Sequence, residues 1–179
     1  LVNQKGGVGK TTSSINLAAS LGVLKRRVLL VDLDPQGNAS TGIGIDKSTI
    51  KKSIYDLLLD NAELSEAIIK TKFKNLYVIP ATINLAGADI ELMEKSRYEP
   101  GFSKGGQLKK YLSQAKEMFD YIIIDCPPSL GILTTNALTA ADSVIIPVQC
   151  EFFALEGIMQ LINTIMLAQK NLNPALDIE

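Results

Sequence analysis

The chain has 179 residues, 46% of them hydrophobic, and a net charge of −1, which suits one compact domain with its own core. It contains no apolar run long enough to cross a bilayer and no secretory signal. It also contains no histidine, so the usual general base and the commonest transition-metal ligand are missing. Its two cysteines, Cys126 and Cys150, lie outside any Cys-x-x-Cys spacing and are interpreted as reduced cytosolic thiols.

A glycine-rich stretch, KGGVGKTT at residues 5–12, lies close to the start of the chain. It follows Leu1 and Val2, which have the character of the end of an apolar strand, and a helix is expected to open at Thr11 or Thr12. Glycines let successive backbone N–H groups turn inward around phosphate oxygens. In such a loop Lys10 reaches the β- and γ-phosphates and the Thr11 hydroxyl binds Mg²⁺. The stretch therefore predicts a nucleotide site.

This loop departs from the general phosphate-loop pattern at two positions. Gln4 stands where the general pattern begins with glycine, and Lys5 is an additional cation that the general mechanism does not use. The sequence fits a variant of the loop, and Lys5 requires an explanation of its own.

The remainder of the chain alternates strands with helices. Strands are expected at residues 27–32, 76–80, 121–125 and 143–148. Helices are expected at residues 14–21, 53–59, 65–70, 86–95, 107–119, 132–141 and 154–169, with a polar loop at residues 96–106. The alternation predicts an α/β, doubly wound fold with a mostly parallel sheet, helices on both faces, and a site at the carboxyl ends of the strands.

Aspartates end two of the expected strands. Asp32 and Asp34 follow the run at residues 28–31, and Asp125 follows the most hydrophobic run, at residues 121–124. A carboxylate at such an edge can hold Mg²⁺ through a water molecule, as in phosphoryl-transfer enzymes. Taken alone, Asp32 or Asp34 could equally cap the strand or form the turn.

Three of these stretches together resemble the ParA/Soj partition ATPases, members of the deviant Walker A superfamily that also contains MinD. They are KGGVGKTT (5–12), DLDPQGN (32–38) and IDCPPS (124–129), and a fourth, PVQCEFFALEG (147–157), is similar to a family segment. The resemblance implies a fold of P-loop NTPase type, with ATP and Mg²⁺ as cofactors. It also implies that residues 1–179 form a single P-loop ATPase domain, truncated at the N-terminal strand and in the C-terminal part.

The resemblance assigns a role to each site residue. Phosphate and nucleotide binding fall to Lys5, Gly6, Gly7, Val8, Gly9, Lys10, Thr11, Thr12, Asp34 and Asp125, and metal binding to Thr11, Asp34 and Asp125. Lys5, Lys10 and Asp34 are the catalytic candidates. Lys5 is the signature lysine that reaches the partner's ATP across a sandwiched dimer, and Asp34 positions the attacking water. Asp32 is interpreted as structural.

The partners implied by the resemblance are a second copy in the ATP-bound state, non-specific DNA, and a ParB-like centromere-binding protein. The location expected is the bacterial cytoplasm, on the nucleoid, without a membrane. The basic clusters at residues 25–27, 51–52, 70–74 and 109–110 are scattered along the sequence and are each interpreted as a solvated helix face or loop. The family's main DNA contacts and its adenine-recognition loop fall beyond residue 179.

Three other functions stay open on the sequence alone. A MinD-like membrane-positioning ATPase shares the loop and Lys5, although residues 34–38 resemble the partition branch more closely. An iron–sulfur protein could use Cys126 or Cys150, although clusters generally need four thiolates at suitable spacing. A biosynthetic ligase or a tyrosine kinase could share the same loop. The sequence leaves undecided whether a helix-turn-helix precedes Leu1 and whether the cargo is a chromosome or a plasmid.

Overall fold

The computed structural model describes residues 1–149 and 154–179. Its strands are β1 (Val28–Asp32), β2 (Ile69–Lys70), β3 (Leu76–Ile79), β4 (Tyr121–Asp125), β5 (Ser143–Val144) and β6 (Asp177–Ile178). Its α-helices are α1 (Lys10–Val23), α2 (Asn38–Gly42), α3 (Ile54–Leu58), α4 (Leu64–Ala67), α5 (Ala88–Tyr98), α6 (Gln107–Ala115), α7 (Ile132–Ala140) and α8 (Ala154–Asn171). Short 3₁₀ helices occupy Lys47–Thr49 and Ile83–Gly87.

The sheet is mostly parallel, as the sequence predicts. Four strands run in the order β2-β3-β1-β4, with β1 parallel to both β3 and β4, and β5 pairs in parallel with β6. Leu1 and Val2 lie between the two groups: the Leu1 nitrogen donates to the Ile124 carbonyl at 2.6 Å, and the Val2 nitrogen donates to the Ile145 carbonyl at 3.1 Å. They occupy the position of a strand between β4 and β5.

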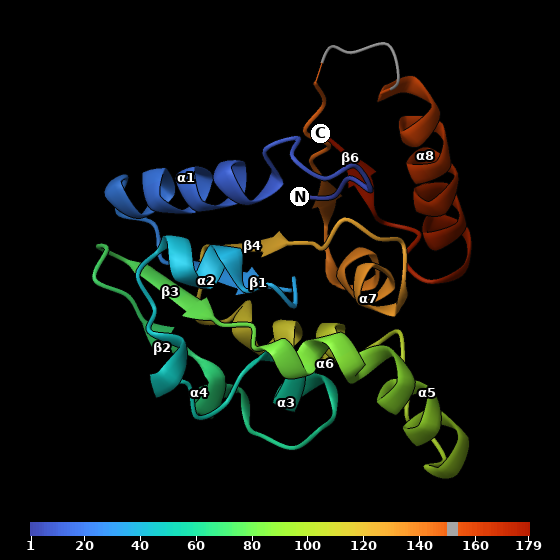
Figure 1. Ribbon diagram of the computed structural model, residues 1–179, viewed down its shortest axis with the longest axis horizontal. Helices are drawn as coiled ribbons and strands as arrows, with labels where there is room; N and C mark the ends of the chain where they lie inside the picture. Colours follow the sequence, from blue (N-terminus) through green and yellow to red (C-terminus); the bar gives the residue numbers. More distant parts are fainter. Residues whose placement is uncertain (150–153) are drawn as a thin grey trace.

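Helices cover both faces of the sheet (Figure 1). Alternate residues of β1 point to opposite faces. Val28 and Leu30 pack with Ala18 of α1 and Ala39 of α2, whereas Leu29 belongs to the larger core formed with α3 and α5–α8. The predicted doubly wound α/β class is confirmed.

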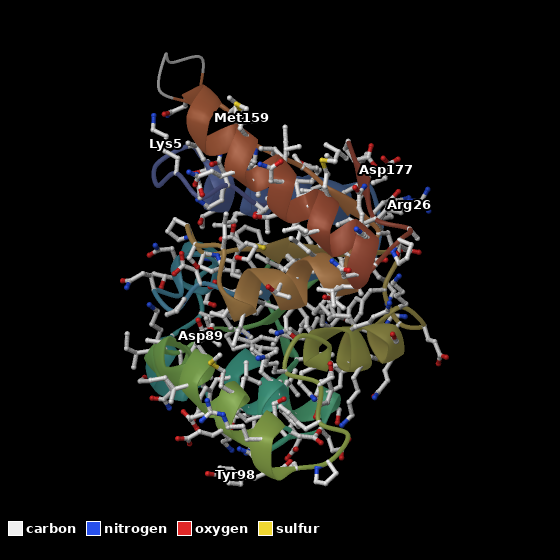
Figure 2. The ribbon with its side chains drawn as sticks, turned by 90° about the vertical axis from the view of Figure 1, so that its right-hand side faces the viewer. Lys5, Arg26, Asp89, Tyr98, Met159 and Asp177 are labelled. Atoms are coloured by element: carbon white, nitrogen blue, oxygen red, sulfur yellow. The ribbon has the colours of Figure 1, made fainter. Side chains whose placement is uncertain are left out.

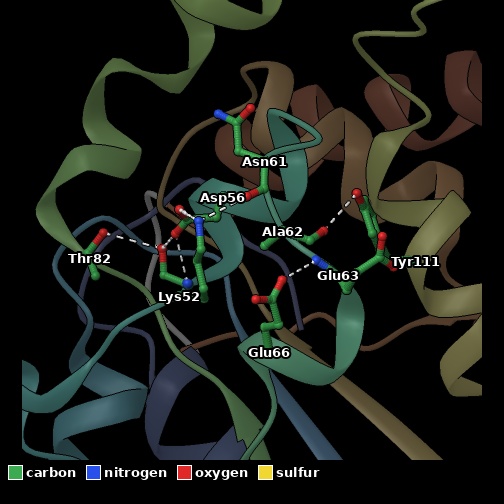
Figure 3. A network of polar contacts seen from close by, with 9 residues as sticks. Lys52, Asp56, Asn61, Ala62, Glu63, Glu66, Thr82 and Tyr111 are labelled. Carbon is green, nitrogen blue, oxygen red and sulfur yellow. Dashed lines mark hydrogen bonds and ion pairs between the residues drawn. The ribbon is translucent and has the colours of Figure 1, made fainter.

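Reciprocal caps stabilise the starts of the short helices α3 and α4, which lie beside α6 (Figure 3). The Ser53 nitrogen donates to Asp56 Oδ2 at 2.9 Å, and the Glu63 nitrogen donates to Glu66 Oε2 at 2.8 Å. Lys52 Nζ donates to the same Asp56 carboxylate and to the Asn61 carbonyl. A capping side chain satisfies N–H groups that a helix start leaves unpaired, so very short helices persist here.

Several predicted boundaries are wrong. The helix expected at residues 65–70 ends at Ala67, because Ile69 and Lys70 pair antiparallel with β3. The strand expected at residues 143–148 keeps ladder pairing only at Ser143–Val144, and the helix expected to 119 ends at Ala115. Helix α1 opens at Lys10 and α5 extends to Tyr98. Tertiary pairing decides such short elements more than local pattern does.

No helix in the described residues is long and apolar enough to cross a membrane.

Candidate nucleotide-binding site

The phosphate loop has the backbone that its glycines permit. Gly7 and Gly9 have φ of +76° and +88°, in the left-handed region that side chains disfavour. The Ser13 nitrogen donates to the Gly9 carbonyl at 2.8 Å, so the first turn of α1 grows directly out of the loop. The positive end of the helix dipole and the loop N–H groups therefore meet at one place, as an anion-binding site requires.

Lys10 is the first residue of α1 and its side chain is buried. Its ammonium donates to the Lys5 carbonyl at 3.0 Å, which keeps the charge against the loop. Burial lowers the pKa of Lys10, and the carboxylates of Asp125 and Asp34 oppose that fall. The cation is thus held at the loop, within the electrostatic influence of Asp34 and Asp125.

Asp125 ends β4 and is fully buried. Its Oδ1 accepts a hydrogen bond from the Ser14 hydroxyl at 2.9 Å, whereas its Oδ2 has no hydrogen-bond partner among the described residues. Burial raises the pKa of this carboxyl, and the hydroxyls of Thr11 and Ser14 oppose the rise. A buried carboxylate oxygen without a partner is costly unless something binds it.

The oxygen atoms around Asp125 suit Mg²⁺ as metal ligands. The Thr11 hydroxyl and the carboxylate of Asp125 supply hard oxygen ligands, which Mg²⁺ prefers. Mg²⁺ fills the rest of its coordination shell with waters and substrate phosphates. The described residues contain no group of three or more His, Cys, Asp or Glu that could hold a metal alone. The site therefore fits a cation that arrives with a phosphate, and it does not fit an all-protein metal cage.

The turn after β1 is tied down by Asp32. Its carboxylate accepts hydrogen bonds from the Asp34 nitrogen at 3.2 Å, and from the Ser40 nitrogen and hydroxyl, both at 2.7 Å. Burial raises the pKa of Asp32 to about 6, although the Ser40 hydrogen bonds lower it. Asp34 is also buried, and its Oδ1 accepts from the Gln36 nitrogen at 2.9 Å. Asp32 shapes the turn that carries Asp34.

Lys5 lies at the edge of a cleft of about 600 Å³ beside the start of α8 (Figure 2). The cleft is also lined by Asn3, Gln4, Val8, Pro128, Ser129, Leu130, Gln149, Gly157 and Gln160. Gln149 Nε2 donates to the Gly7 carbonyl at 3.1 Å, and Gln4 Nε2 donates to Gln160 Oε1 at 3.1 Å. These bonds attach the phosphate loop to the segment around α8.

Cys126 does not have the properties of a cluster ligand. Its side chain is buried, and burial raises the pKa of the thiol to about 11, so the thiolate that ligates iron is disfavoured. Cys150 lies outside the described residues, as do residues 151–153 of the predicted family segment.

The structure brings most of the predicted residues together. Gly6 to Thr12, Asp34 and Asp125 meet at the carboxyl ends of β1 and β4, where Asp32 and Asp125 are register partners. Two supporting residues were missed. Ser14 lies one turn after Lys10 on the buried side of α1, a spacing that the sequence shows. Asn3 accepts a hydrogen bond from the Lys5 nitrogen and donates one to the Pro147 carbonyl. Nothing in the local sequence predicts this contact between residues distant along the chain.

Fold and site together define the class of phosphate-loop nucleotide-binding proteins. A family model described as an AAA domain matches residues 1–178. The sporulation initiation inhibitor protein Soj of Bacillus subtilis is 58% identical over 179 residues, covering 100% of this chain and 68% of its own length. The chromosome partitioning protein ParA of Myxococcus xanthus is 52% identical, covering 99% and 60%. The chain belongs to the ParA/Soj family.

A solved structure agrees with this assignment of fold. It is described as cobyrinic acid a,c-diamide synthase from Mycobacterium smegmatis with bound ATP analog and magnesium, and has a TM-score of 0.90 and 44% identity. The alignment covers 99% of this chain and 70% of that one. The chain thus spans 60–70% of the length of these three proteins.

Proposed function

We propose that the full-length protein is a Mg²⁺-dependent ATPase that dimerises on ATP and partitions a chromosome or plasmid. The observation that carries the proposal is the Oδ2 of Asp125, which has no hydrogen-bond partner among residues 1–149 and 154–179 and is buried beside Thr11 and the Lys10 ammonium. The names of relatives such as Soj and ParA support the partition role. The ATP analog and magnesium described for the M. smegmatis protein support the choice of ligands.

The chain's own residues would bind and orient ATP. The loop from Gly6 to Thr12 wraps the phosphates with its N–H groups, and Lys10 moves from the Lys5 carbonyl to the phosphate oxygens. Thr11, Asp125 and Asp34 hold Mg²⁺, which neutralises charge on the β- and γ-phosphates.

Asp34 positions the attacking water and Lys5 acts on the partner's ATP. The cleft beside Lys5 is open, and a second copy facing it would receive the Lys5 ammonium at its own phosphates. A cation delivered in trans stabilises charge on the transferred phosphoryl group, and the equivalent arginine of other NTPases contributes ~10³–10⁵ in rate. With no histidine in the chain, catalysis depends on positioning and electrostatics, which suits slow, partner-stimulated hydrolysis.

The partners proposed for the full-length protein are non-specific DNA and a ParB-like centromere-binding protein that stimulates hydrolysis. ATP holds the dimer together through contacts to its γ-phosphate, and hydrolysis releases them. The bound nucleotide therefore decides whether the protein is a dimer.

Lys5→Ala tests the dimer. The variant should bind ATP with nearly normal affinity but fail to form the ATP-dependent dimer, since the ammonium assigned to the partner's phosphates is lost. Size-exclusion chromatography with ATP and Mg²⁺ reports the dimer, and fluorescent-nucleotide titration reports binding. Lys109→Ala, an exposed lysine of α6, is the matched control. An unchanged dimer peak for Lys5→Ala would refute the proposal.

A further inference from the structure

A buried asparagine holds the backbone of Lys5. Asn3 lies two residues before Lys5 and is only 4% exposed. Its Oδ1 accepts a hydrogen bond from the Lys5 nitrogen at 3.0 Å, which closes an Asx turn. Its Nδ2 donates to the Pro147 carbonyl at 2.8 Å and ties that turn to a residue 144 positions away. Asn3 therefore fixes the backbone from which the Lys5 side chain extends.

The Asn3 side chain makes the middle one of three contacts between the start of the chain and the segment that follows β5. On one side of it, the Val2 nitrogen donates to the Ile145 carbonyl at 3.1 Å. On the other side, Gln149 Nε2 donates to the Gly7 carbonyl at 3.1 Å. The two outer contacts fix the chain before and after the turn, and the middle one fixes the turn itself.

Lys10 holds the other backbone polar group of Lys5. Its ammonium donates to the Lys5 carbonyl at 3.0 Å. In the ATP-bound state proposed above, this ammonium moves to the phosphate oxygens, so the contact to the carbonyl is given up. The bond between Asn3 and the Lys5 nitrogen does not use the ammonium and is kept. Asn3 thus continues to hold Lys5 in the state in which Lys5 has to act.

We propose that Asn3 is a positioning residue for Lys5 and acts, through it, on the active site of the partner subunit. A cation delivered across an interface must lie accurately at the phosphate oxygens, since a displacement of about 1 Å can cost about 10²-fold in rate. The Asx turn, tied to the segment after β5, fixes the base of a long side chain and lowers the entropy lost when it binds. The inference rests on the proposed function for the action of Lys5 in trans.

Mixed dimers of the full-length protein separate this role from support of Asn3's own phosphate loop. Asn3→Ala is combined with Asp34→Ala in one sample and with Lys5→Ala in another, before ATP is added. In the first sample, the Asn3→Ala subunit keeps its own Asp34 and receives a well-placed Lys5, so turnover should rise well above that of either variant alone. In the second, neither site receives a well-placed Lys5, and turnover should stay low.

Asn173→Ala is the matched control for the loss of a buried asparagine. Asn173 is 7% exposed, and its Nδ2 donates to the Leu138 and Ala141 carbonyls at 3.0 and 2.7 Å. It follows α8, at the opposite end of that helix from Gly157, which lines the cleft beside the phosphate loop. Asn3→Ala should lower turnover by about tenfold or more. Asn173→Ala should keep turnover near wild type, although urea unfolding shows both variants to be destabilised.

Asn3→Ser is the conservative variant. A serine hydroxyl closes the same kind of turn more weakly, so Asn3→Ser should keep more turnover than Asn3→Ala. Fluorescent-nucleotide titration should give near-normal ATP binding for both, because residues 6–12 of the phosphate loop are unchanged. If Asn3→Ala does not fold, the two mixtures are made with Asn3→Ser instead.

Recovery of turnover in the mixture with Lys5→Ala would overturn the inference, because the Asn3 variant would then still supply a working Lys5. Equal losses in Asn3→Ala and Asn173→Ala would also overturn it, since destabilisation alone would explain them. The mixture of Lys5→Ala with Asp34→Ala is the reference. If the reference stays inactive, the proposed function fails and the inference fails with it. If the reference recovers but Asn3→Ala with Asp34→Ala does not, only the role of Asn3 is refuted.

Discussion

The ends of β1 and β4 carry two aspartates that are register partners and yet differ in how they are satisfied. Asp32 and Asp125 are both completely buried. Asp32 accepts three hydrogen bonds from its own turn, whereas Oδ1 of Asp125 accepts from the Ser14 hydroxyl and its Oδ2 has no hydrogen-bond partner in the part of the chain that the structure describes. A carboxylate satisfied by the chain stabilises a conformation, and one left incomplete is free to bind a ligand. We therefore assign Asp32 to holding its turn in place, and Asp125 to the Mg²⁺ site proposed above.

Of the two aspartate variants, Asp125→Asn gives the larger expected effect on activity. ATP turnover should fall by about 10–100-fold, because a carboxylate oxygen proposed to support Mg²⁺ is lost. Stability without nucleotide should not fall, since the amide keeps an oxygen for the Ser14 hydroxyl and removes an incompletely satisfied buried charge. Phosphate-release assays and urea unfolding measure the two effects. If Asp125→Asn lost stability but kept its turnover, Asp125 would have the structural role that is assigned here to Asp32.

Asp32→Asn should lower the stability of the fold more than it lowers activity. One carboxylate oxygen becomes an NH₂ group facing donors from Asp34 or Ser40, so the free energy of unfolding should drop by about 1–3 kcal/mol. Turnover should decrease less than in Asp125→Asn, through loosening of the turn that carries Asp34. Urea denaturation at pH 7.5 measures the change, and a variant as stable as wild type would show that Asp32 does not anchor this turn.

The pH dependence of stability gives a smaller effect. The folded pKa of Asp32, about 6, lies above its ordinary value of 3.8, so the folded state holds more protons between these values. The free energy of unfolding should therefore fall as pH rises through this window, by about 1 kcal/mol from Asp32 between pH 5 and pH 7. Asp125 contributes in the same direction. Urea titrations of wild type and Asp32→Asn should show a flatter dependence in the variant; identical curves would contradict the assignment.

Local signals in the sequence were enough to predict the fold class and the phosphate loop. Gly7 and Gly9 indicate positions where the backbone needs a positive φ. β-Branched runs such as residues 121–124 indicate buried strands. The difference between Asp32 and Asp125 was only partly visible, because it depends on Ser40 and Ser14, which are brought in by folding. The contact between two basic segments was missed for the same reason: residues 25–27 and 70–74 are distant along the chain and become neighbours only through Gly22 and Asn75.

The central claim is that Lys5 and Asp34 of different subunits complete one active site. Lys5→Ala and Asp34→Ala should each hydrolyse ATP poorly alone, the second remaining an ATP-bound dimer. In a mixed dimer, the Lys5→Ala subunit keeps its own Asp34 and receives Lys5 from its partner, so one intact site is restored. An equimolar mixture, combined before ATP is added, should regain turnover well above that of either variant alone, because only mixed dimers contain an intact site. A mixture as inactive as either variant alone would contradict the account.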